Sequence, residues 1–114
     1  MQRANRLRAT SDYQRVRAAR RSFANALLVL YVAPNDLGRP RVGISVSRRI
    51  GKAVVRNRVR RRVREAARLR LSADGPGLDL VFVARGPSGQ ADWPAIHDAV
   101  DDLLRRACRR SRGA

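Results

Sequence analysis

The segment RNRVRRRVRE, residues 56–65, places six arginines among ten residues in the interior of the chain. Apolar side chains recur at helical spacing through this segment and on either side of it, at Val55, Val59, Val63, Ala66 and Ala67. This period predicts an amphipathic helix over residues 54–71, with its apolar stripe packed on a core. The rest of the helix surface is almost wholly cationic, because Glu65 is its only acid.

The charged face of this helix lacks the acids that normally accompany exposed arginines. Asn57, Arg61, Arg64 and Arg68 would point roughly opposite the apolar stripe, and Arg56 and Arg60 would lie on a flank. Like charges one turn apart destabilise a helix by about 0.2–0.5 kcal/mol per pair. A merely solvated face would leave the missing acids unexplained, whereas a nucleic-acid backbone would supply the counter-charge. The helix therefore predicts a polyanionic partner.

The composition agrees with a single folded domain that carries a large positive charge. The chain has 114 residues, about the length of one domain, and 44% of them are hydrophobic. Its net charge is +17, and Lys52 is the only lysine among its 26 basic residues. Such a charge attracts polyanions, and the planar arginine fork matches phosphate groups. Composition alone does not distinguish DNA from RNA.

The sequence predicts a cytoplasmic protein. Cys108 is the only cysteine, so no internal disulfide is possible. The amino-terminal segment MQRANRLRATSD has no apolar core of the kind that a signal peptide requires. No apolar run in the sequence reaches the length needed to cross a membrane.

Signals for two further helices flank the basic one. SDYQ, residues 11–14, has the pattern of a capping box, so a first helix is expected over residues 12–20 with Ser11 as its cap. Asp92 is expected to cap the last helix, with a proline tolerated in its first turn.

Three segments have the composition of strands: residues 26–32, 41–47 and 78–84. In the second of these the side chains alternate, so that Val42, Ile44 and Val46 would face the core and Gly43, Ser45 and Ser47 the other side. This alternation predicts a small, polar, open sheet face. Because a strand follows the basic helix, at least one pair of strands is expected to be parallel, as in a βαβ unit.

The sequence contains no catalytic motif of familiar spacing. His97, the only histidine, lies in a polar stretch and is expected at the surface. The nearby Asp98, Asp101 and Asp102 are expected to pair with arginines or to solubilise the chain rather than to hold a metal ion. A metal-dependent nuclease that acts alone is therefore the least supported function, for want of acidic ligands at a suitable spacing.

Two tyrosines favour RNA over DNA as the partner. Tyr13 on the first helix and Tyr31 in a strand would lie near the polar sheet face, and unpaired bases stack on such side chains beside basic grooves. The alternative, that both are half-buried core residues, stays open. Two other functions also stay open: a general RNA-binding module, such as a ribosomal protein, and a DNA-binding protein that places the basic helix in a major groove.

The central part of the chain closely resembles the signature of the bacterial ribonuclease P protein component: RVGISVSRRIGKAVVRNRVRRRVREAAR, residues 41–68. The signature's RNR element matches residues 56–58, and the basic and acidic residues that follow it match Arg60, Arg61, Arg64 and Glu65. The agreement continues in NRLRATSDYQRV near the amino end, in LLVLYV and in LDLVFVAR. It therefore covers nearly the whole chain.

The resemblance implies an α/β (α+β) two-layer sandwich similar to the second domain of ribosomal protein S5. The implied element order is α-β-β-β-α-β-α, in a single domain over residues 1–114 with a flexible basic arm (1–10) and a flexible tail (110–114). The resemblance also implies a left-handed βαβ crossover, although the general rule for such units predicts the right-handed form.

The resemblance also implies a function in tRNA processing. The family's protein joins a catalytic RNA to form ribonuclease P, an endonuclease that removes the 5′ leader from precursor tRNA. The RNA performs the hydrolysis with Mg²⁺ held mainly by itself and the substrate, so neither a catalytic nor a metal-binding residue is expected on the protein. The protein is expected to bind the leader and the RNA subunit, which broadens substrate binding and lowers the Mg²⁺ requirement.

Carried over by position, the resemblance assigns two sets of residues. The set expected to bind the RNA subunit is Arg56, Asn57, Arg58, Arg60, Arg61 and Arg64. The set expected to bind the leader is Tyr13, Arg17, Tyr31, Ser45, Ser47, Arg49 and Lys52. Arg17 departs from the family pattern, which usually has an aromatic residue there, although a guanidinium plane can also stack on a base. The segment AARRSF, residues 18–23, lacks the family's usual glycine, so a different exit from the first helix is expected.

Overall fold

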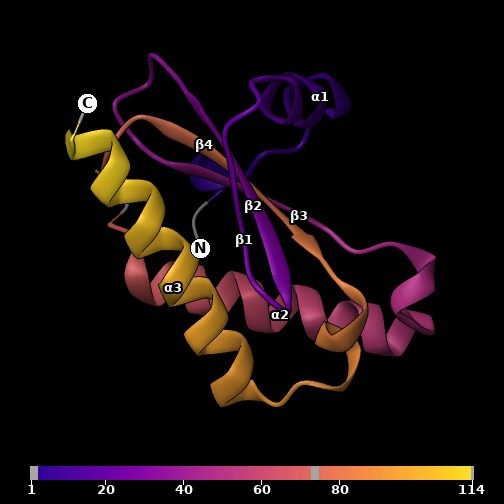
Figure 1. Ribbon diagram of the computed structural model, residues 1–114. Helices are drawn as coiled ribbons and strands as arrows, with labels where there is room; N and C mark the ends of the chain where they lie inside the picture. The colour runs from indigo at the N-terminus through magenta and orange to yellow at the C-terminus, as the bar shows by residue number, and fades with distance from the viewer. Residues whose placement is uncertain (1–2, 73–74, 114) are drawn as a thin grey trace.

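The computed structural model describes residues 3–72 and 75–113, which form a four-stranded sheet and three α-helices (Figure 1). The elements follow one another as α1 (Thr10–Ala18), β1 (Ser22–Ala24), β2 (Leu28–Pro34), β3 (Arg41–Ser45), α2 (Ala53–Arg70), β4 (Leu78–Ala84) and α3 (Trp93–Gly113). Three short 3₁₀ helices are also present: η1 (Arg3–Asn5), η2 (Arg48–Ile50) and η3 (Gly86–Gln90). This order confirms the predicted α-β-β-β-α-β-α arrangement.

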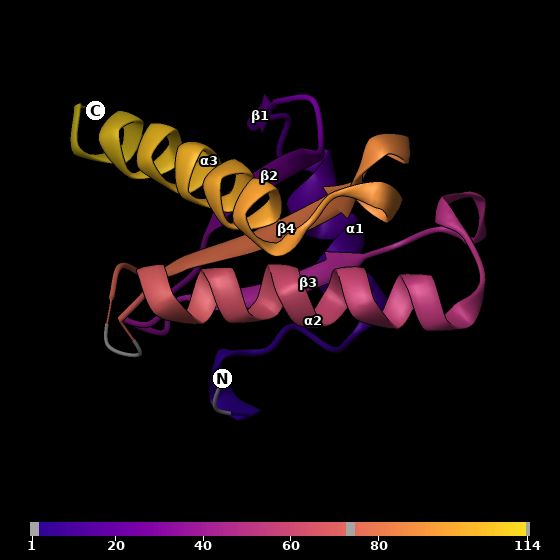
Figure 2. The same ribbon diagram turned by 90° about the horizontal axis from the view of Figure 1, so that it is seen from below.

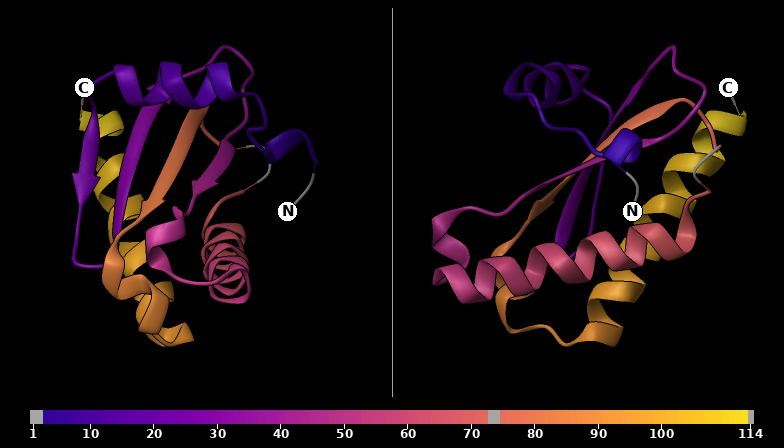
Figure 3. Two further views of the ribbon diagram at one scale, coloured as in Figure 1. Left: turned by 90° about the vertical axis from the view of Figure 1, so that its right-hand side faces the viewer. Right: turned by 180° about the vertical axis from the view of Figure 1, so that it is seen from behind.

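The sheet is mixed, with the strand order β1-β2-β4-β3. β2 pairs antiparallel with β1 and with β4, whereas β3 pairs parallel with β4, from Arg41 opposite Asp79 to Ser45 opposite Val83. Because α2 connects β3 to β4, the parallel pair confirms the predicted βαβ unit. Figures 1 and 3 show that α2 crosses on the side that makes this connection left-handed, as the resemblance implies and against the general rule.

The two faces of the sheet are covered unequally. Figure 2 shows α2 and α3 in front of the sheet and α1 behind it. The main core lies between the sheet and these two long helices, where Leu30, Phe82 and Leu103 are fully buried. A smaller cluster, which includes the fully buried Val16 and Val81, lies beneath α1. Since α1 has only nine residues, it covers part of its face and leaves the rest to solvent.

The first helix begins and ends differently from the prediction. α1 starts at Thr10, and the amide of Asp12 donates to the carbonyl of Ala9 at 3.1 Å, with no side-chain cap. Ser11 therefore lies inside the helix, and the predicted capping box is wrong. After the helix, Arg20 takes the left-handed backbone conformation (φ 59°) that a glycine usually supplies at this place.

The strands and the basic helix lie within two residues of their predicted positions. β4 coincides with its prediction, and α2 begins and ends one residue earlier than expected. β2 is shifted by two residues, to Leu28–Pro34, and β3 ends two residues early, at Ser45. β1 has three residues, which is too short to show the alternation by which a strand is recognised in a sequence.

The described part of the basic arm lies along the sheet. The amide of Leu7 donates to the carbonyl of Val42 at 2.9 Å, and the Asn5 side chain donates to the carbonyl of Pro40 at 2.8 Å. The arm therefore covers the β3 edge next to α1. Residues 1 and 2 lie outside the described part of the chain.

The last helix begins where the sequence predicts. The carboxylate of Asp92 accepts the amide of Ala95 at 3.0 Å, which confirms the predicted cap. The backbone of α3 stays helical to Gly113, so that of the expected tail only Ala114 lies outside the described residues. No helix in residues 3–72 or 75–113 is long and apolar enough to cross a membrane.

Candidate nucleic-acid interface

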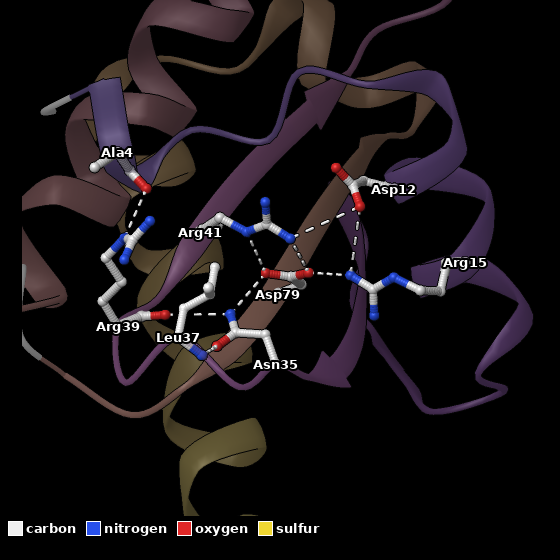
Figure 4. A network of polar contacts seen from close by, with 8 residues as sticks. All are labelled: Ala4, Asp12, Arg15, Asn35, Leu37, Arg39, Arg41 and Asp79. Carbon is white, nitrogen blue, oxygen red and sulfur yellow. Dashed lines mark hydrogen bonds and ion pairs between the residues drawn. The ribbon is translucent and has the colours of Figure 1, made fainter.

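A buried carboxylate ties α1 to one end of the sheet (Figure 4). Asp79 of β4 is fully buried and accepts hydrogen bonds from the Arg41 guanidinium at 2.8 and 2.9 Å and from Asn35 Nδ2 at 2.8 Å. Arg15 of α1 donates to the same carboxylate, and Arg15 and Arg41 each lie 3.7 Å from Asp12. Burial would raise the pKa of Asp79, but the hydrogen bonds from Arg41, Asn35 and Arg15 outweigh it and lower that pKa. This group, the Asp79 network, fixes where α1 crosses the strands.

Tyr13 is held against the sheet by its hydroxyl group. The hydroxyl accepts the amide of Ile44 at 3.0 Å and donates to the carbonyl of Leu7 at 3.4 Å. The ring lies directly over Gly43, because a Cβ on this residue would stand 2.5 Å from Tyr13 Cζ. Gly43 is therefore buried and does not line an open sheet face, contrary to the prediction from alternation. Tyr13 forms a half-buried wall beside the part of the face that remains open.

Arg17 and Tyr31 meet at the edge of α1. The guanidinium carbon of Arg17 lies 5.4 Å from the centre of the Tyr31 ring, within the range of a cation–π contact. Arg17 is exposed and Tyr31 is half-buried. Arg17, which departs from the family pattern, thus contacts Tyr31 at the edge of α1.

The sheet face beyond α1 is a strip of small and branched side chains. Val29, Val83 and Ser45 lie side by side on β2, β4 and β3, and all three are half-buried. The left panel of Figure 3 shows α1 across one end of the strands and the other end uncovered. Together with Arg17 and Tyr31, these three residues form the open strip.

The rest of the predicted leader set follows β3 at the end of the open strip. Ser47 precedes η2, Arg49 lies within it, and Lys52 precedes α2; all three are exposed. The structure therefore brings Arg17, Tyr31 and Ser45 into one strip and adds a hydroxyl and two cations at its end. Tyr13 is the exception, since its hydroxyl is already used within the fold.

The predicted RNA-subunit set is spread over more than one side of α2. The helix buries its predicted stripe of Val59, Val63, Ala66 and Ala67. Asn57 and Arg61 are exposed, whereas Arg56, Arg58, Arg60 and Arg64 are half-buried on the flanks. On one flank Arg60 donates to the Asn57 side chain at 2.9 Å, and on the other Arg58 donates to the carbonyl of Gly89 at 3.1 Å.

The amino-terminal part of α2 carries charge that the fold does not neutralise. In the described part of the chain, no carboxylate pairs with an arginine between positions 56 and 64. Burial lowers the pKa of Arg64, and repulsion from Arg6 and Arg60 lowers it further. The Nε atoms of Arg6 and Arg56 are buried without a hydrogen-bond partner among the described residues. Because its arginines have no carboxylate partner among the described residues, we name residues 53–64 the unpaired half of α2.

The carboxyl-terminal part of α2 differs, because its arginines have acidic partners. Arg68 pairs with Glu65, and Arg70 lies 3.3 Å from Asp101 of α3. Asp101 and Asp102 also pair with α3 arginines, at 3.1 and 3.4 Å, as the sequence predicts. No three His, Cys, Asp or Glu side chains gather as a metal site within residues 3–72 and 75–113.

Sequence reasoning missed the Asp79 network. Its only signal was an aspartate inside the apolar strand LDLVFVA, because a buried carboxylate requires partners. The partners could not be found from the pattern, since Arg41 and Arg15 lie 38 and 64 positions away. Taken together, the fold and its surface define a small α/β protein that presents an unpaired cationic helix beside a partly open sheet.

Comparison with known proteins assigns this protein to a family. The sequence profile of the Ribonuclease P family matches residues 1–108. A ribonuclease P protein component from Roseiflexus castenholzii is 47% identical over 108 residues, which cover 94% of this chain and 88% of the relative. One from Clostridium botulinum is 42% identical over 104 residues, with 90% and 94% covered. The chain belongs to the ribonuclease P protein family.

Solved structures agree with this assignment. The RNase P protein of Staphylococcus aureus has a TM-score of 0.84 to this chain at 30% identity, with 92% of this chain and 96% of that one covered. The RNase P protein of Thermotoga maritima has a TM-score of 0.79 at 30% identity, with 89% and 96% covered. The fold that the resemblance implied is therefore confirmed.

Proposed function

We propose that the chain is the protein subunit of ribonuclease P and acts with a catalytic RNA to remove the 5′ leader from precursor tRNA. The observation that carries this proposal is the unpaired half of α2 beside the open strip. The first is a cationic surface for which the fold supplies no counter-charge, and the second offers side chains on which bases can stack. In this role the protein belongs to a cytoplasmic endoribonuclease, and the RNA performs the hydrolysis.

In the proposed division of labour, α2 binds the RNA subunit and the open strip binds the leader. The contacts to the RNA subunit come from Arg56, Asn57, Arg58, Arg60, Arg61 and Arg64, whose guanidinium groups match phosphate oxygens. Tyr31 and Arg17 provide stacking surfaces for unpaired bases, and Arg49 and Lys52 neutralise leader phosphates. With ~6–10 phosphate contacts, RNA affinity should fall about 10³–10⁵-fold between 50 and 200 mM salt.

The cationic surface should also lower the Mg²⁺ requirement of the proposed reaction. When bound, Mg²⁺ activates the attacking water and stabilises the leaving oxygen. Within residues 3–72 and 75–113, no three acidic side chains gather as a metal site, and Asp12, Asp79, Glu65 and Asp101 are paired with arginines. In the proposed complex, Mg²⁺ is held by the RNA subunit and the substrate, while the protein's arginines neutralise phosphates that would otherwise require additional ions.

The test is to mix the protein with a bacterial ribonuclease P RNA and precursor tRNA at low Mg²⁺ and to map the 5′ end of the product. Cleavage at the mature 5′ end that requires both components supports the proposal. RNA binding without any promotion of cleavage would make a general RNA-binding module the better account. Equal competition by duplex DNA would favour the DNA-binding alternative.

A further inference from the structure

A second cationic site lies on the flank of α2 that faces η3 and the start of α3. A cavity of about 360 Å³ is lined there by Arg58, Arg61, Arg62, Glu65 and Trp93. The hollow is shallow and open to solvent, so it offers a binding surface and not an enclosed site. Arg58 and Arg62 are one turn apart on α2, on the flank away from Arg60 and Arg64. The cavity, named the Trp93 pocket, is thus separate from the open strip.

Two arginines of the Trp93 pocket are already held in position. Arg58 donates to the carbonyl of Gly89 at 3.1 Å, and Arg62 donates to the carbonyl of Ala91 at 2.8 Å. Each bond uses one of the five N–H donors of a guanidinium group, so that most donors remain for a ligand. Because these side chains are ordered before binding, anion binding costs less side-chain entropy here than at a freely moving arginine.

The pocket keeps a positive charge. Its single acid, Glu65, accepts hydrogen bonds from Arg68 on both carboxylate oxygens, at 2.5 and 3.0 Å. Within the described residues, Arg58, Arg61 and Arg62 have no carboxylate partner. Three arginines therefore line one hollow whose single acid already pairs with Arg68.

Trp93 gives this cationic cavity an aromatic wall. The side chain is half-buried: part of it packs against the main core, and part lines the cavity. Its ring also lies 5.6 Å from the His97 ring, tilted by 59°. An indole ring beside guanidinium groups is the combination that binds an unpaired base together with its phosphate.

We propose that the Trp93 pocket binds one unpaired nucleotide of single-stranded RNA. The base stacks on Trp93, and the phosphate lies among Arg58, Arg61 and Arg62. This site adds Arg62 and Trp93 to the residues expected from the family, and it rests on the proposed function only in that RNA is the partner. Two RNAs can supply the nucleotide: the RNA subunit and the precursor tRNA.

The fluorescence of Trp93 tests this proposal directly, because it is the only tryptophan in the chain. The unmodified protein is titrated separately with ribonuclease P RNA and with precursor tRNA, and the RNA that quenches the emission is the source of the nucleotide. Arg62→Gln should lower the salt slope of binding to that RNA by about 1. Arg105→Gln, which removes an exposed arginine of the same charge from α3, should leave the slope unchanged. Trp93→Leu should weaken binding by about 5-fold to 150-fold, the loss expected for one stacked base.

The outcomes separate this site from the proposed function. Quenching by either RNA, together with the smaller slope in Arg62→Gln, supports the Trp93 pocket. If filter binding shows that both RNAs bind but neither changes the emission, the pocket is overturned and the proposed function stands. If Arg62→Gln and Arg105→Gln behave alike, the pocket is also overturned. If no RNA binds at all, both proposals fail.

Discussion

The Asp79 network and the unpaired half of α2 use arginine in opposite ways. Around Asp79, Arg15 and Arg41 meet a buried carboxylate and tie α1 to the sheet. In α2, Arg60 and Arg61 have no carboxylate partner among the described residues. The first group stabilises the fold, whereas the second repels itself until an external anion binds. A count of charges cannot separate the two groups, because only the presence or absence of a partner distinguishes them.

The largest expected effect comes from removing the carboxylate of the first group. Asp79→Asn should lower the free energy of unfolding by about 2–3 kcal/mol, because Arg15 and Arg41 would lose their nearest carboxylate and keep only Asp12, 3.7 Å away. The loss is smaller than for a fully buried pair, since the Arg15 side chain is 45% exposed. Urea unfolding at neutral pH measures it, with Asp98→Asn on the surface of α3 as the control. Equal losses in the two variants would show that the network does not hold the fold together.

The same carboxylate should make stability depend on pH. Because the pKa of Asp79 is lowered in the folded protein, its contribution is complete above the unfolded-state pKa of about 3.9 and is lost as pH falls through the folded-state value. The unfolding free energy of the unmodified protein should therefore fall more steeply below about pH 4 than that of Asp79→Asn. Urea unfolding over a series of acidic pH values compares the two slopes. If the unfolding free energies of the two proteins fall in parallel with pH, Asp79 is not the cause of the pH dependence.

A change in the open strip should affect one RNA more than another. Tyr31→Ala should weaken binding of leader-bearing precursor by about 5-fold to 150-fold, the effect of losing one stacked base. Mature tRNA, which lacks the leader, should lose less. Tyr31→Phe is the matched control, because it keeps the ring and should retain most of the affinity. Equal losses for precursor and mature tRNA would show that Tyr31 is a core residue and does not bind the leader.

The smallest expected effect is the response of the free protein to anions. At low ionic strength the repulsion within the unpaired half of α2 is least screened, so sulfate or a short polyanion should raise the Tm. For a chain of this size, each kcal/mol of binding corresponds to about 4–8 °C. Sodium chloride at the same ionic strength separates general screening from binding. The absence of a shift with sulfate would show that the repulsion does not limit stability.

Much of the fold could be predicted because it depends on local sequence patterns. The apolar stripe of α2 repeats at helical spacing and β4 is a nearly continuous apolar run, and both elements lie within one residue of their predicted positions. The open sheet face was only partly predictable. Alternation correctly placed Ser45 on it, but Gly43 is covered by Tyr13, whose position depends on contacts made by α1.

The charges of the site were harder to predict than its helix. Sequence spacing placed the arginines of α2 outside the core, but it could not show which arginines elsewhere have partners. The partners of Asp79 come from a helix and a strand that are distant in the chain. The Trp93 pocket could not be predicted for the same reason. Its residues come from α2 and α3, and Trp93 meets Arg58 and Arg62 because these two helices pack together.

The most direct test compares the two groups of arginines in one set of measurements. Arg60→Gln/Arg61→Gln and Arg15→Gln/Arg41→Gln remove equal charge, and each variant is assayed for Tm and for the salt dependence of binding to ribonuclease P RNA. The α2 variant should lower the salt slope by about 2, one for each lost phosphate contact, without lowering the Tm. The Asp79-network variant should lower the Tm and keep the slope. An unchanged slope in the α2 variant would contradict the claim that its unpaired arginines bind RNA.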